Sequence, residues 1–345
     1  MQIPKRILIV RTDRIGDVIL STPVIKNLRN FYPSAHIAFM CRPYTKDIAE
    51  GNPYLDEVIV YDKDGKHKSI WKSIGFASYL RKKKFDLAII LHPTDRMHTL
   101  LFFCGIAQRV GWNKKKGWLL TQAIPHTKQE GSKHELEYTL DILRAMNIPV
   151  VDKDMYFPIK EEAEQKIEKI LKENKIEDRE EFIVIHPSAS CPSKRWPQEY
   201  FSKLVRLLKE KAGVKIAIIT SKDEKSFGEQ IVKENEVVDL RGNLSVAEIG
   251  SLLKRAKLFI SNDSGPVHIA AALGIPVISI FGRNDFGLSP KRWKPLGEKS
   301  IYIHKPPFEC PICLAHNCTK GFLCLKAIKP EDVFEKALIL LNTPV

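Results

Sequence analysis

The amino-acid sequence predicts an α/β protein with two doubly wound, parallel-sheet domains. Three observations support this prediction. Short β-rich runs alternate with amphipathic helical segments, the pattern of parallel sheets with crossover helices. The alternation breaks around Pro149–Pro158 and then begins again. A chain of 345 residues is also long enough for two ordinary domains with cores of their own.

The first series of elements should form a domain of residues 1–158. Its first strand is expected at Arg6–Val10, followed by a helix at Asp17–Asn30 with apolar residues at helical spacing. Further strands are expected at His36–Met40, Glu57–Tyr61 and Leu87–Leu91, and further helices at Ile70–Lys83 and Glu135–Met146.

A linker of residues 159–180, including a charged helix at Glu161–Asn174, should lead into a second domain of residues 181–345. The last helix is a candidate to pack back on the first domain. In the second domain we expect strands at Phe182–His186, Lys215–Thr220, Val237–Leu240, Leu258–Ser261 and Pro276–Phe281, and helices at Pro197–Lys211, Lys225–Glu234, Val246–Ala256 and Pro266–Leu273.

Basic residues outnumber acidic ones, 55 to 41, and the excess is concentrated in the first half. Residues 1–155 hold 25 Lys and Arg against 16 Asp and Glu, a net charge of +9. This charge indicates an anionic partner such as nucleic acid, phosphorylated lipid or a membrane surface. No nucleic-acid-binding motif accompanies it, so no nucleic acid is expected. The apolar run Ile7–Val10 is too short for a secretory signal, which predicts a cytoplasmic protein.

The strongest candidate site is a turn between a strand and a helix of the second domain. Ser264 or Gly265 can cap that helix, and Pro266 suits its first position. Backbone N–H groups and the positive end of the helix dipole then favour a phosphate group. A capped helix without a ligand is the structural alternative. Asp263 and His268, on either side of the cap, favour a phosphate site.

A second candidate is the loop of residues 186–197, which follows the first strand of the second domain. Ser188 or Ser190 can donate a hydrogen bond there, and Lys194 can supply a point charge to a diphosphate. The loop is not a P-loop, because no Gly-x4-Gly-Lys-Ser/Thr motif occurs in the chain. Together the loop and the turn predict one anion-binding site.

The third candidate is the turn Arg11–Asp17, at the end of the first strand of the first domain. Gly16 permits a tight turn, and Asp17 lies near a helix N-terminus. The carboxylate of Asp17 is either a helix cap or a general base towards a bound hydroxyl group.

Four of the seven cysteines lie within fifteen residues near the C-terminus. Four thiols can bind zinc, but their spacing is not that of two C-x2-C knuckles. Reduced thiols or a disulfide are therefore favoured over zinc. The four are Cys310, Cys313, Cys318 and Cys324.

The three sites together resemble the glycosyltransferase family typified by the ADP-heptose:lipopolysaccharide heptosyltransferases, glycosyltransferase family 9. The turn at 13–17, the loop at 186–197 and the turn at 262–268 match this family in order and spacing. The resemblance runs across nearly the whole chain, including Arg109-Val110-Gly111-Trp112 and the cysteine-bearing tail.

The resemblance implies a GT-B fold, in which two Rossmann-like domains face each other across a cleft. The first domain would bind the acceptor and the second the nucleotide sugar. Asp17 would be the catalytic base, Glu224 the ribose contact and Leu244 the adenine contact. The residues implied in donor binding are Ser188, Lys194, Glu224, Leu244, Asp263, Ser264, Gly265 and His268.

The resemblance further implies an inverting, metal-independent transfer of heptose from ADP-heptose to the inner core of lipopolysaccharide, with no cofactor. The helix dipole and Lys194 would take the place of a divalent cation at the diphosphate. Basic residues of the first domain suit an anionic acceptor. The candidates for acceptor binding are Arg14, His92 and Arg96.

Two alternatives remain open at this point. One is a GT-B transferase that uses another nucleotide sugar for a cell-surface glycan, and the other is a nucleotide-sugar 2-epimerase. The basic first half also predicts peripheral association of this cytoplasmic protein with the inner membrane.

Overall fold

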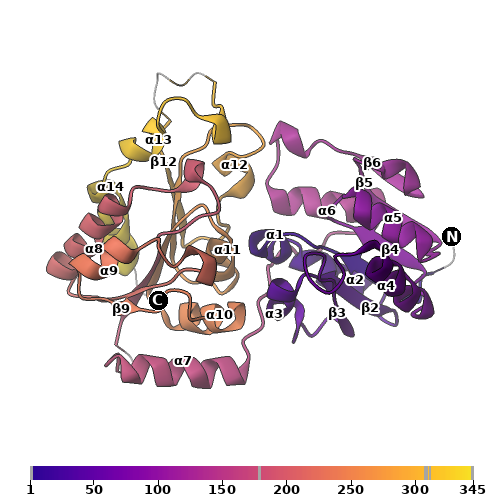
Figure 1. The fold of residues 1–345 in the computed structure, drawn as a ribbon, viewed down its shortest axis with the longest axis horizontal. Coiled ribbons are helices and arrows are strands. Elements are labelled where there is room, and N and C mark those ends of the chain that lie inside the picture. The colour runs from indigo at the N-terminus through magenta and orange to yellow at the C-terminus, as the bar shows by residue number, and fades with distance from the viewer. Residues whose placement is uncertain (1–2, 178–179, 307–309, 311, 343–345) are drawn as a thin grey trace. The chain divides into compact units, whose positions relative to one another are not determined.

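The computed structural model describes residues 3–177, 180–306, 310 and 312–342. They form two compact α/β units (Figure 1). The first comprises the residues up to Gln129 together with Glu135–Pro158, and the second comprises Glu130–His134 and the residues from Ile159 on. Each unit contains one six-stranded sheet whose strand pairs are all parallel. The prediction of two doubly wound parallel sheets is confirmed.

The sheet of the first unit has the strand order β3-β2-β1-β4-β5-β6. Chain order reverses at β1, which pairs with β2 on one side and β4 on the other. Ligands of open α/β sheets bind at such a reversal, beyond the carboxyl ends of the strands. The strands are β1 (Arg6–Val10), β2 (His36–Cys41), β3 (Glu57–Val60), β4 (Leu87–Ile90), β5 (Gln108–Asn113) and β6 (Gln122–Pro125).

The helix predicted at Asp17–Asn30 is two helices with a break at Ser21. Pro23 has no N–H, and in a continuous helix its ring would collide with the carbonyl group of Ile19. At the break, the Ser21 hydroxyl donates to the backbone oxygen of Asp17 at 2.7 Å. The helices of this unit are α1 (Ile15–Ile19), α2 (Thr22–Phe31), α3 (Lys46–Ala49), α4 (Ile70–Lys82), α5 (Asp95–Phe103) and α6 (Glu135–Ala145).

The sheet of the second unit has the order β12-β11-β10-β7-β8-β9, with the reversal between β7 and β10. The residues that follow β7, β8, β10 and β11 therefore emerge at one edge of the sheet. The strands are β7 (Phe182–His186), β8 (Lys215–Ile218), β9 (Val238–Asp239), β10 (Leu258–Asn262), β11 (Val277–Phe281) and β12 (Ser300–His304).

Helices α7, α8, α10 and α11 of the second unit agree with the predicted ones to within one residue at each end, α9 begins four residues later than predicted, and α12 and α13 were not predicted. Helix α9 begins only after Gly228, whose φ of +95° is a left-handed conformation that interrupts the predicted segment. The helices are α7 (Glu161–Glu173), α8 (Gln198–Ala212), α9 (Glu229–Glu234), α10 (Val246–Arg255), α11 (Gly265–Ala272), α12 (Pro290–Trp293), α13 (Leu323–Ala327) and α14 (Pro330–Leu341).

The last helix, α14, packs into the core of the second unit. Val333, Phe334 and Ala337 form its buried side and share one apolar cluster with Leu204 and Leu208 of α8. This stripe at helical spacing complements the apolar side of α8.

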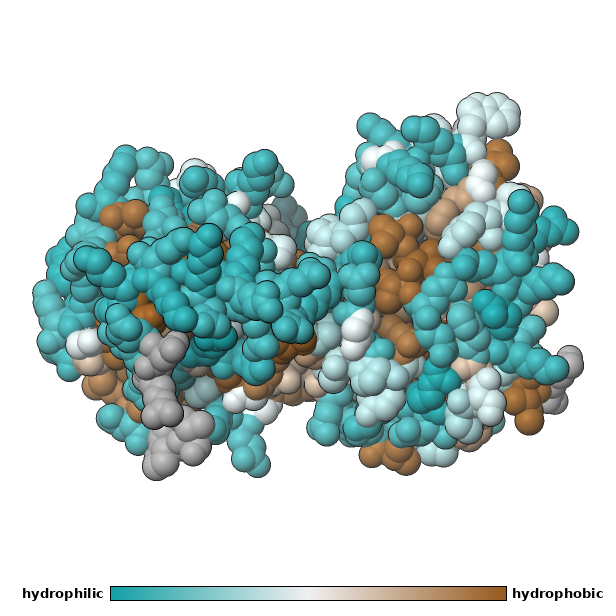
Figure 2. All heavy atoms as spheres, turned by 90° about the horizontal axis from the view of Figure 1, so that it is seen from below, coloured by the Kyte–Doolittle hydropathy of each residue, from teal (hydrophilic) through white to brown (hydrophobic). Residues whose placement is uncertain are grey.

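Hydrophilic side chains cover most of the face drawn in Figure 2, with smaller groups of hydrophobic ones between them. Within the described ranges, no helix combines the length and the apolar character that crossing a membrane requires.

Candidate active site

A buried carboxylate joins two cations at the carboxyl edge of the second sheet. Asp263 directly follows β10, Lys194 lies in the 3-10 turn Pro192–Lys194 after β7, and Arg283 follows β11. Asp263 Oδ2 accepts a hydrogen bond from Arg283 Nη2 at 2.5 Å and lies 3.1 Å from Lys194 Nζ. Three loops that are distant in sequence are therefore connected through one oxygen atom.

Burial alone would raise the pKa of Asp263, but the charges of Lys194 and Arg283 hold it below its usual value. The carboxylate is therefore ionised at neutral pH. With two cations and one anion, the trio keeps one net positive charge. The edge of the second sheet is electrostatically suited to an anion.

The side-chain amide of Asn262 fixes the backbone of the loop that carries Lys194. Its Oδ1 accepts a hydrogen bond from the N–H of Trp196 at 3.0 Å, and its Nδ2 donates to the carbonyl of Pro187 at 2.8 Å. Both ends of the loop are thus tied to β10. The position of Lys194 depends on this amide as well as on Asp263.

A second network at the same edge connects Ser188, predicted in donor binding, with Glu224. Ser188 donates its hydroxyl hydrogen to Glu224 Oε2 at 3.0 Å, and its oxygen lies 3.0 Å from His186 Nε2. Because that one hydrogen goes to Glu224, His186 must donate through Nε2. Its Nδ1 then accepts from Ser261, whose Oγ is 3.1 Å away. Burial lowers the pKa of His186 to about 4, so the ring is neutral.

Helix α11 begins one residue earlier than predicted. Ser264 is the N-cap residue, Gly265 the first and Pro266 the second residue of the helix. The Ser264 side chain makes no capping hydrogen bond and lies 2.8 Å from Ser261 Oγ instead, which links the helix start to the network of His186. His268 is buried one turn further on.

Leu244 is half-buried in the loop between β9 and α10. The structure thus brings the predicted residues Ser188 and Glu224 into one network, Lys194 and Asp263 into another, and leaves Leu244 on a separate loop of the same edge.

In the first unit, the guanidinium of Arg11 organises three carboxylates. Arg11 directly follows β1 and is only 1% exposed. Its Nη2 donates to Asp17 Oδ1 at 2.6 Å and to Glu135 Oε1 at 3.2 Å, and its Nε lies 2.9 Å from Asp13 Oδ1. Its Nη1 donates to the carbonyl of Leu91 at 3.0 Å, which ties the ends of β1 and β4 together.

Asp17 does not cap helix α1. The N-cap residue is Arg14, and Asp17 lies within the first turn, with its Oδ1 bound to Arg11. Glu135, at the start of α6, also binds Lys128, with 2.6 Å between Oε1 and Nζ. The orientation of the Asp17 carboxylate is therefore fixed by buried ion pairs.

Asp13 has an unusual protonation equilibrium. Burial raises its pKa to about 7, although Arg11 lies close by and opposes the rise. The nearby negative charges of Asp17 and Glu135 act in the same direction as burial. Asp13 is therefore more readily protonated near neutral pH than most aspartates, which are fully ionised there.

The three residues predicted to bind the acceptor have different environments. Arg14 is exposed next to the cluster around Arg11. His92 is half-buried, with its Nδ1 3.5 Å from Thr12 Oγ1, and burial lowers its pKa to about 3, so it is neutral. Arg96 donates to Ser73 Oγ at 2.7 Å and to the carbonyl of His67, and it packs over the ring of Tyr61. Arg96 therefore links α5, on which it lies, to α4 and to the segment before α4.

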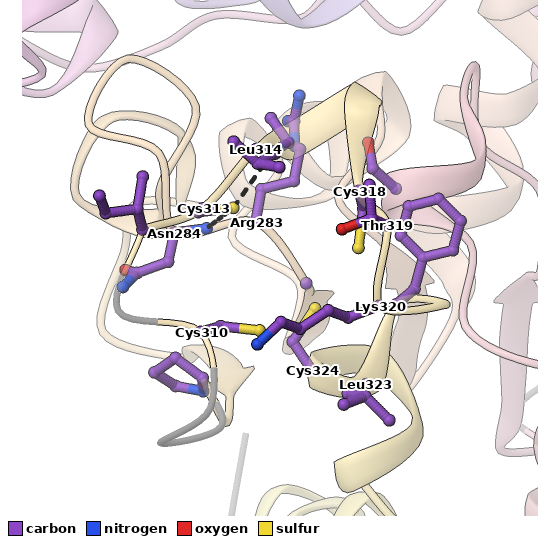
Figure 3. A pocket seen from close by; sticks show the side chains of 16 residues that line it. Arg283, Asn284, Cys310, Cys313, Leu314, Cys318, Thr319, Lys320, Leu323 and Cys324 are labelled. Carbon is purple, nitrogen blue, oxygen red and sulfur yellow. Dashed lines mark hydrogen bonds between the residues drawn. The ribbon is translucent and has the colours of Figure 1, made fainter.

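The four clustered cysteines line one small cavity of about 60 Å³ in the second unit (Figure 3). All are free thiols, and burial raises the pKa of Cys324 to about 11. In the part of the chain that the structure describes, no three His, Cys, Asp or Glu side chains are grouped as a metal site requires. The four thiols, Cys310, Cys313, Cys318 and Cys324, thus share one pocket.

This cysteine-lined segment supports the anion-binding loops. Cys313 Sγ accepts a hydrogen bond from the N–H of Asn284, the residue after Arg283, at 3.3 Å. Ser193, the residue before Lys194, lies 3.0 Å from His316, measured from Oγ to Nδ1. Both cations that bind Asp263 therefore have a direct neighbour in contact with the tail.

Sequence reasoning placed Arg11 in the third candidate turn without giving it a role, and it missed Glu135 and Arg283 as site residues. Arg11 directly follows a buried strand and Arg283 lies two residues after one, which are uncommon places for a charge, and these positions were the available signal. Glu135 carried no such signal, because its partner Arg11 lies 124 residues away.

Replacing Asp13 with Asn should make the protein's stability less dependent on pH. The pKa of Asp13 is higher in the folded than in the unfolded state, so the folded state loses relative stability as pH rises from about 4 to about 7. Asp13→Asn removes this loss. The gain in unfolding free energy over wild type should be larger at pH 8 than at pH 5 by on the order of 2 kcal/mol. Denaturant unfolding of both proteins at pH 5 and pH 8 measures the unfolding free energies. If the difference between variant and wild type were the same at both pH values, the raised pKa of Asp13 would be contradicted.

The family model of glycosyltransferase family 9 (heptosyltransferase) matches residues 74–323, which is more than half of the chain. Among curated proteins, lipopolysaccharide heptosyltransferase 3 of Escherichia coli (strain K12) is 29% identical over 331 residues. The alignment covers 92% of this chain and 93% of that protein.

Two solved structures share the fold. The glycosyl transferase family 9 protein of Veillonella parvula DSM 2008 has a TM-score of 0.88 at 24% identity, covering 99% of this chain and 98% of that one. The E. coli ADP-heptose lps heptosyltransferase II has a TM-score of 0.79 at 22% identity, covering 97% and 98%. The fold is therefore GT-B, and the chain belongs to glycosyltransferase family 9, the heptosyltransferase family of glycosyltransferases.

Proposed function

We propose that this glycosyltransferase transfers heptose from ADP-heptose to the inner core of lipopolysaccharide, with inversion at the anomeric carbon and without a metal ion or another cofactor. The observation that carries the proposal is the buried trio of Asp263, Lys194 and Arg283 beside the start of α11. It offers a fixed positive charge where a nucleotide diphosphate needs one.

In this proposal, residues 181–345 form the nucleotide-sugar domain. The diphosphate lies at the start of α11, near Ser264 and Gly265, and receives hydrogen bonds from Lys194. An ammonium group has three N–H donors, and Asp263 takes one of them. Asp263 is ionised, so it would repel a phosphate oxygen. We therefore assign it the role of holding the two cations in place.

The nucleoside is proposed to bind on the neighbouring loops of the same edge. Both hydrogen bonds from Ser188 and Ser221 go to Glu224 Oε2, so Oε1 is the oxygen that a ribose hydroxyl would reach. Leu244 would pack against adenine. His268, buried one turn into α11, would support the helix start from within.

Residues 1–158 are proposed to bind the acceptor, with 159–180 as the linker between the domains. Asp17 is the proposed catalytic base. Its Oδ1 is occupied by Arg11, which directs Oδ2 to the acceptor hydroxyl. Arg14 is the proposed contact to the acidic groups of the acceptor, and His92, being neutral, a hydrogen-bonding group beside it.

The reaction then proceeds in one displacement. The acceptor hydroxyl oxygen attacks the anomeric carbon of heptose while its proton passes to Asp17. The bond from that carbon to the diphosphate oxygen breaks, and ADP leaves with the electron pair. Lys194 and the N-terminus of α11 stabilise the charge that develops on the leaving diphosphate. A single displacement inverts the anomeric configuration.

The names of the relatives support the donor and the acceptor. The curated relative is a lipopolysaccharide heptosyltransferase, and one structural neighbour is an ADP-heptose enzyme. Together with the family match, this favours heptose transfer over another nucleotide sugar and over 2-epimerisation. A lipid-anchored, anionic acceptor also suits a protein with net charge +14 that works at the cytoplasmic side of the inner membrane. No nucleic-acid partner is proposed.

Mass-spectrometric transfer assays test the proposed function directly. With ADP-heptose and EDTA present, we expect a product one heptose heavier on either a heptose-free or a singly heptosylated lipopolysaccharide acceptor. The anomeric configuration of the product, determined by NMR, should be opposite to that of the donor. Absence of product on both acceptors, with an active control enzyme, would refute the proposed donor and acceptor.

Replacing Asp17 with Asn should lower turnover by about 10²-fold or more, because the carboxylate that accepts the proton is lost. The affinity for ADP, measured by calorimetry, should stay within a few-fold of wild type. Asp13→Asn is the matched control, since Asp13 contacts the same guanidinium. It should lower turnover by less than tenfold, and equal losses in the two variants would show a shared structural effect.

Replacing Lys194 with Ala should weaken ADP binding by about tenfold or more, because a charge-assisted hydrogen bond to the diphosphate is lost. Lys203→Ala provides the control, since Lys203 is an exposed lysine on α8 that pairs with Glu331. Calorimetric titration with ADP measures both variants. Unchanged affinity in Lys194→Ala would remove this lysine from the diphosphate site.

A further inference from the structure

Helices α4 and α5 of the first unit and the 3-10 turn Gly117–Leu119 carry a group of large apolar side chains that are turned to solvent. Trp71, Ile74, Phe103 and Trp118 are 78%, 55%, 67% and 76% exposed. Single exposed apolar residues are common on proteins, but two tryptophans, a phenylalanine and an isoleucine on adjoining elements are unusual. We call these four residues the apolar patch.

The apolar patch adjoins a groove of about 830 Å³ between the two helices. Ile74 and Ala77 of α4 line one side, and Leu100 and Phe103 of α5 line the other. Lys116 closes one end, with its Nζ 3.4 Å from Thr99 on α5, and Trp118 follows it two residues later. Ile74 and Phe103 of the patch thus line the groove, while Trp71 lies one helical turn before Ile74 and Trp118 two residues after Lys116.

The exposed side of α4 is not needed for the core. Phe76 and Leu80 bury the opposite side of the helix among the apolar residues of the first sheet. Trp71 and Ile74, spaced by one helical turn, point away from that cluster. Folding of the unit therefore leaves these two side chains without an apolar environment.

The surroundings of the apolar patch are strongly basic. Residues 65–85 contain seven Lys and Arg and no Asp or Glu, and residues 96–129 contain six and none. Lys68, Arg81 and Lys116 line the groove itself, where Asp95 is the one acidic lining residue among those described. Two exposed lysines lie near the patch residues in sequence: Lys72 directly follows Trp71, and Lys115 is three residues before Trp118.

We propose that this surface of the first unit docks on an anionic lipid bilayer. Aromatic side chains are stable at the boundary between headgroups and acyl chains, and flanking lysines and arginines bind acidic headgroups. The basic side chains around the apolar patch favour a membrane over an apolar protein partner, because an anionic bilayer offers acidic headgroups to the lysines and arginines as well as an apolar interior to the patch. This inference deepens the proposed function by naming the surface that would hold the enzyme at a lipid-anchored acceptor.

Vesicle binding tests the proposal independently of transfer. Purified full-length protein is sedimented with phosphatidylcholine vesicles that contain either no anionic lipid or about one third phosphatidylglycerol, without donor or acceptor. Wild type should bind the anionic vesicles at least tenfold more tightly, and raising the salt from 0.05 to about 0.5 M should remove most of this binding. Equal binding to both kinds of vesicle would overturn the proposal.

Two variants locate the docking surface. Trp71→Ala/Phe103→Ala/Trp118→Ala and Lys72→Glu/Arg81→Glu/Lys115→Glu should each weaken binding to anionic vesicles by tenfold or more. Each variant has a matched control on the second unit. Phe286→Ala/Ile312→Ala removes exposed apolar groups and is the control for the apolar variant. Lys169→Glu/Lys291→Glu/Lys336→Glu reverses exposed charges and is the control for the charge variant. The controls should bind as wild type does, and an equal loss in them would place the contact elsewhere.

The failure of this inference is distinguishable from failure of the proposed function. All variants should retain their turnover on a soluble, delipidated acceptor, because none of the substituted residues belongs to the proposed active site. Membrane docking would be overturned if the wild type bound no vesicles and light scattering showed a dimer that dissociates in Trp71→Ala/Phe103→Ala/Trp118→Ala. The apolar patch would then be the contact with a second copy of the chain.

Discussion

Removing Arg11 and Asp263 from water costs several kilocalories per mole for each ion unless partners compensate the charge. Each lies directly after a central strand of its sheet, at the point where strand order reverses. Their partners come from loops that are distant in sequence, so the loops must meet at these ions. Leaving either ion unpaired would cost about 3–5 kcal/mol, and this cost favours the loop positions that bring the partners to the ions.

The two clusters differ in charge in the way their proposed tasks require. Asp263 with Lys194 and Arg283 keeps one positive charge, which suits a leaving diphosphate. In the first unit, Arg11 and Lys128 face three carboxylates, and partial protonation of Asp13 brings the sum near neutrality. Arg11 can therefore orient Asp17 while the cluster carries no excess of positive charge around the proposed acceptor hydroxyl.

The sequence predicted those parts of the fold and the candidate site that local patterns encode. Strands with continuous apolar runs, such as β7 and β10, and the turn around Ser264 were recognisable because their residues are neighbours in the chain. Strands β5, β6 and β12 escaped prediction because they lack such a run, and β6 and β12 are also only partly buried at the sheet edges. The break before Pro23 was readable in principle, since proline interrupts a helix for a local reason.

The contacts that orient the candidate catalytic groups were not predictable in the same way. Whether a carboxylate near a helix start is a cap or a base depends on what holds it, and Asp17 is held by Arg11, which also binds Glu135. Likewise, the motif that suggested Asp263 as a phosphate ligand did not reveal Arg283, which with Lys194 keeps that carboxylate ionised. A motif therefore identifies where chemistry is placed, whereas the charge balance among distant residues decides which role each group can take.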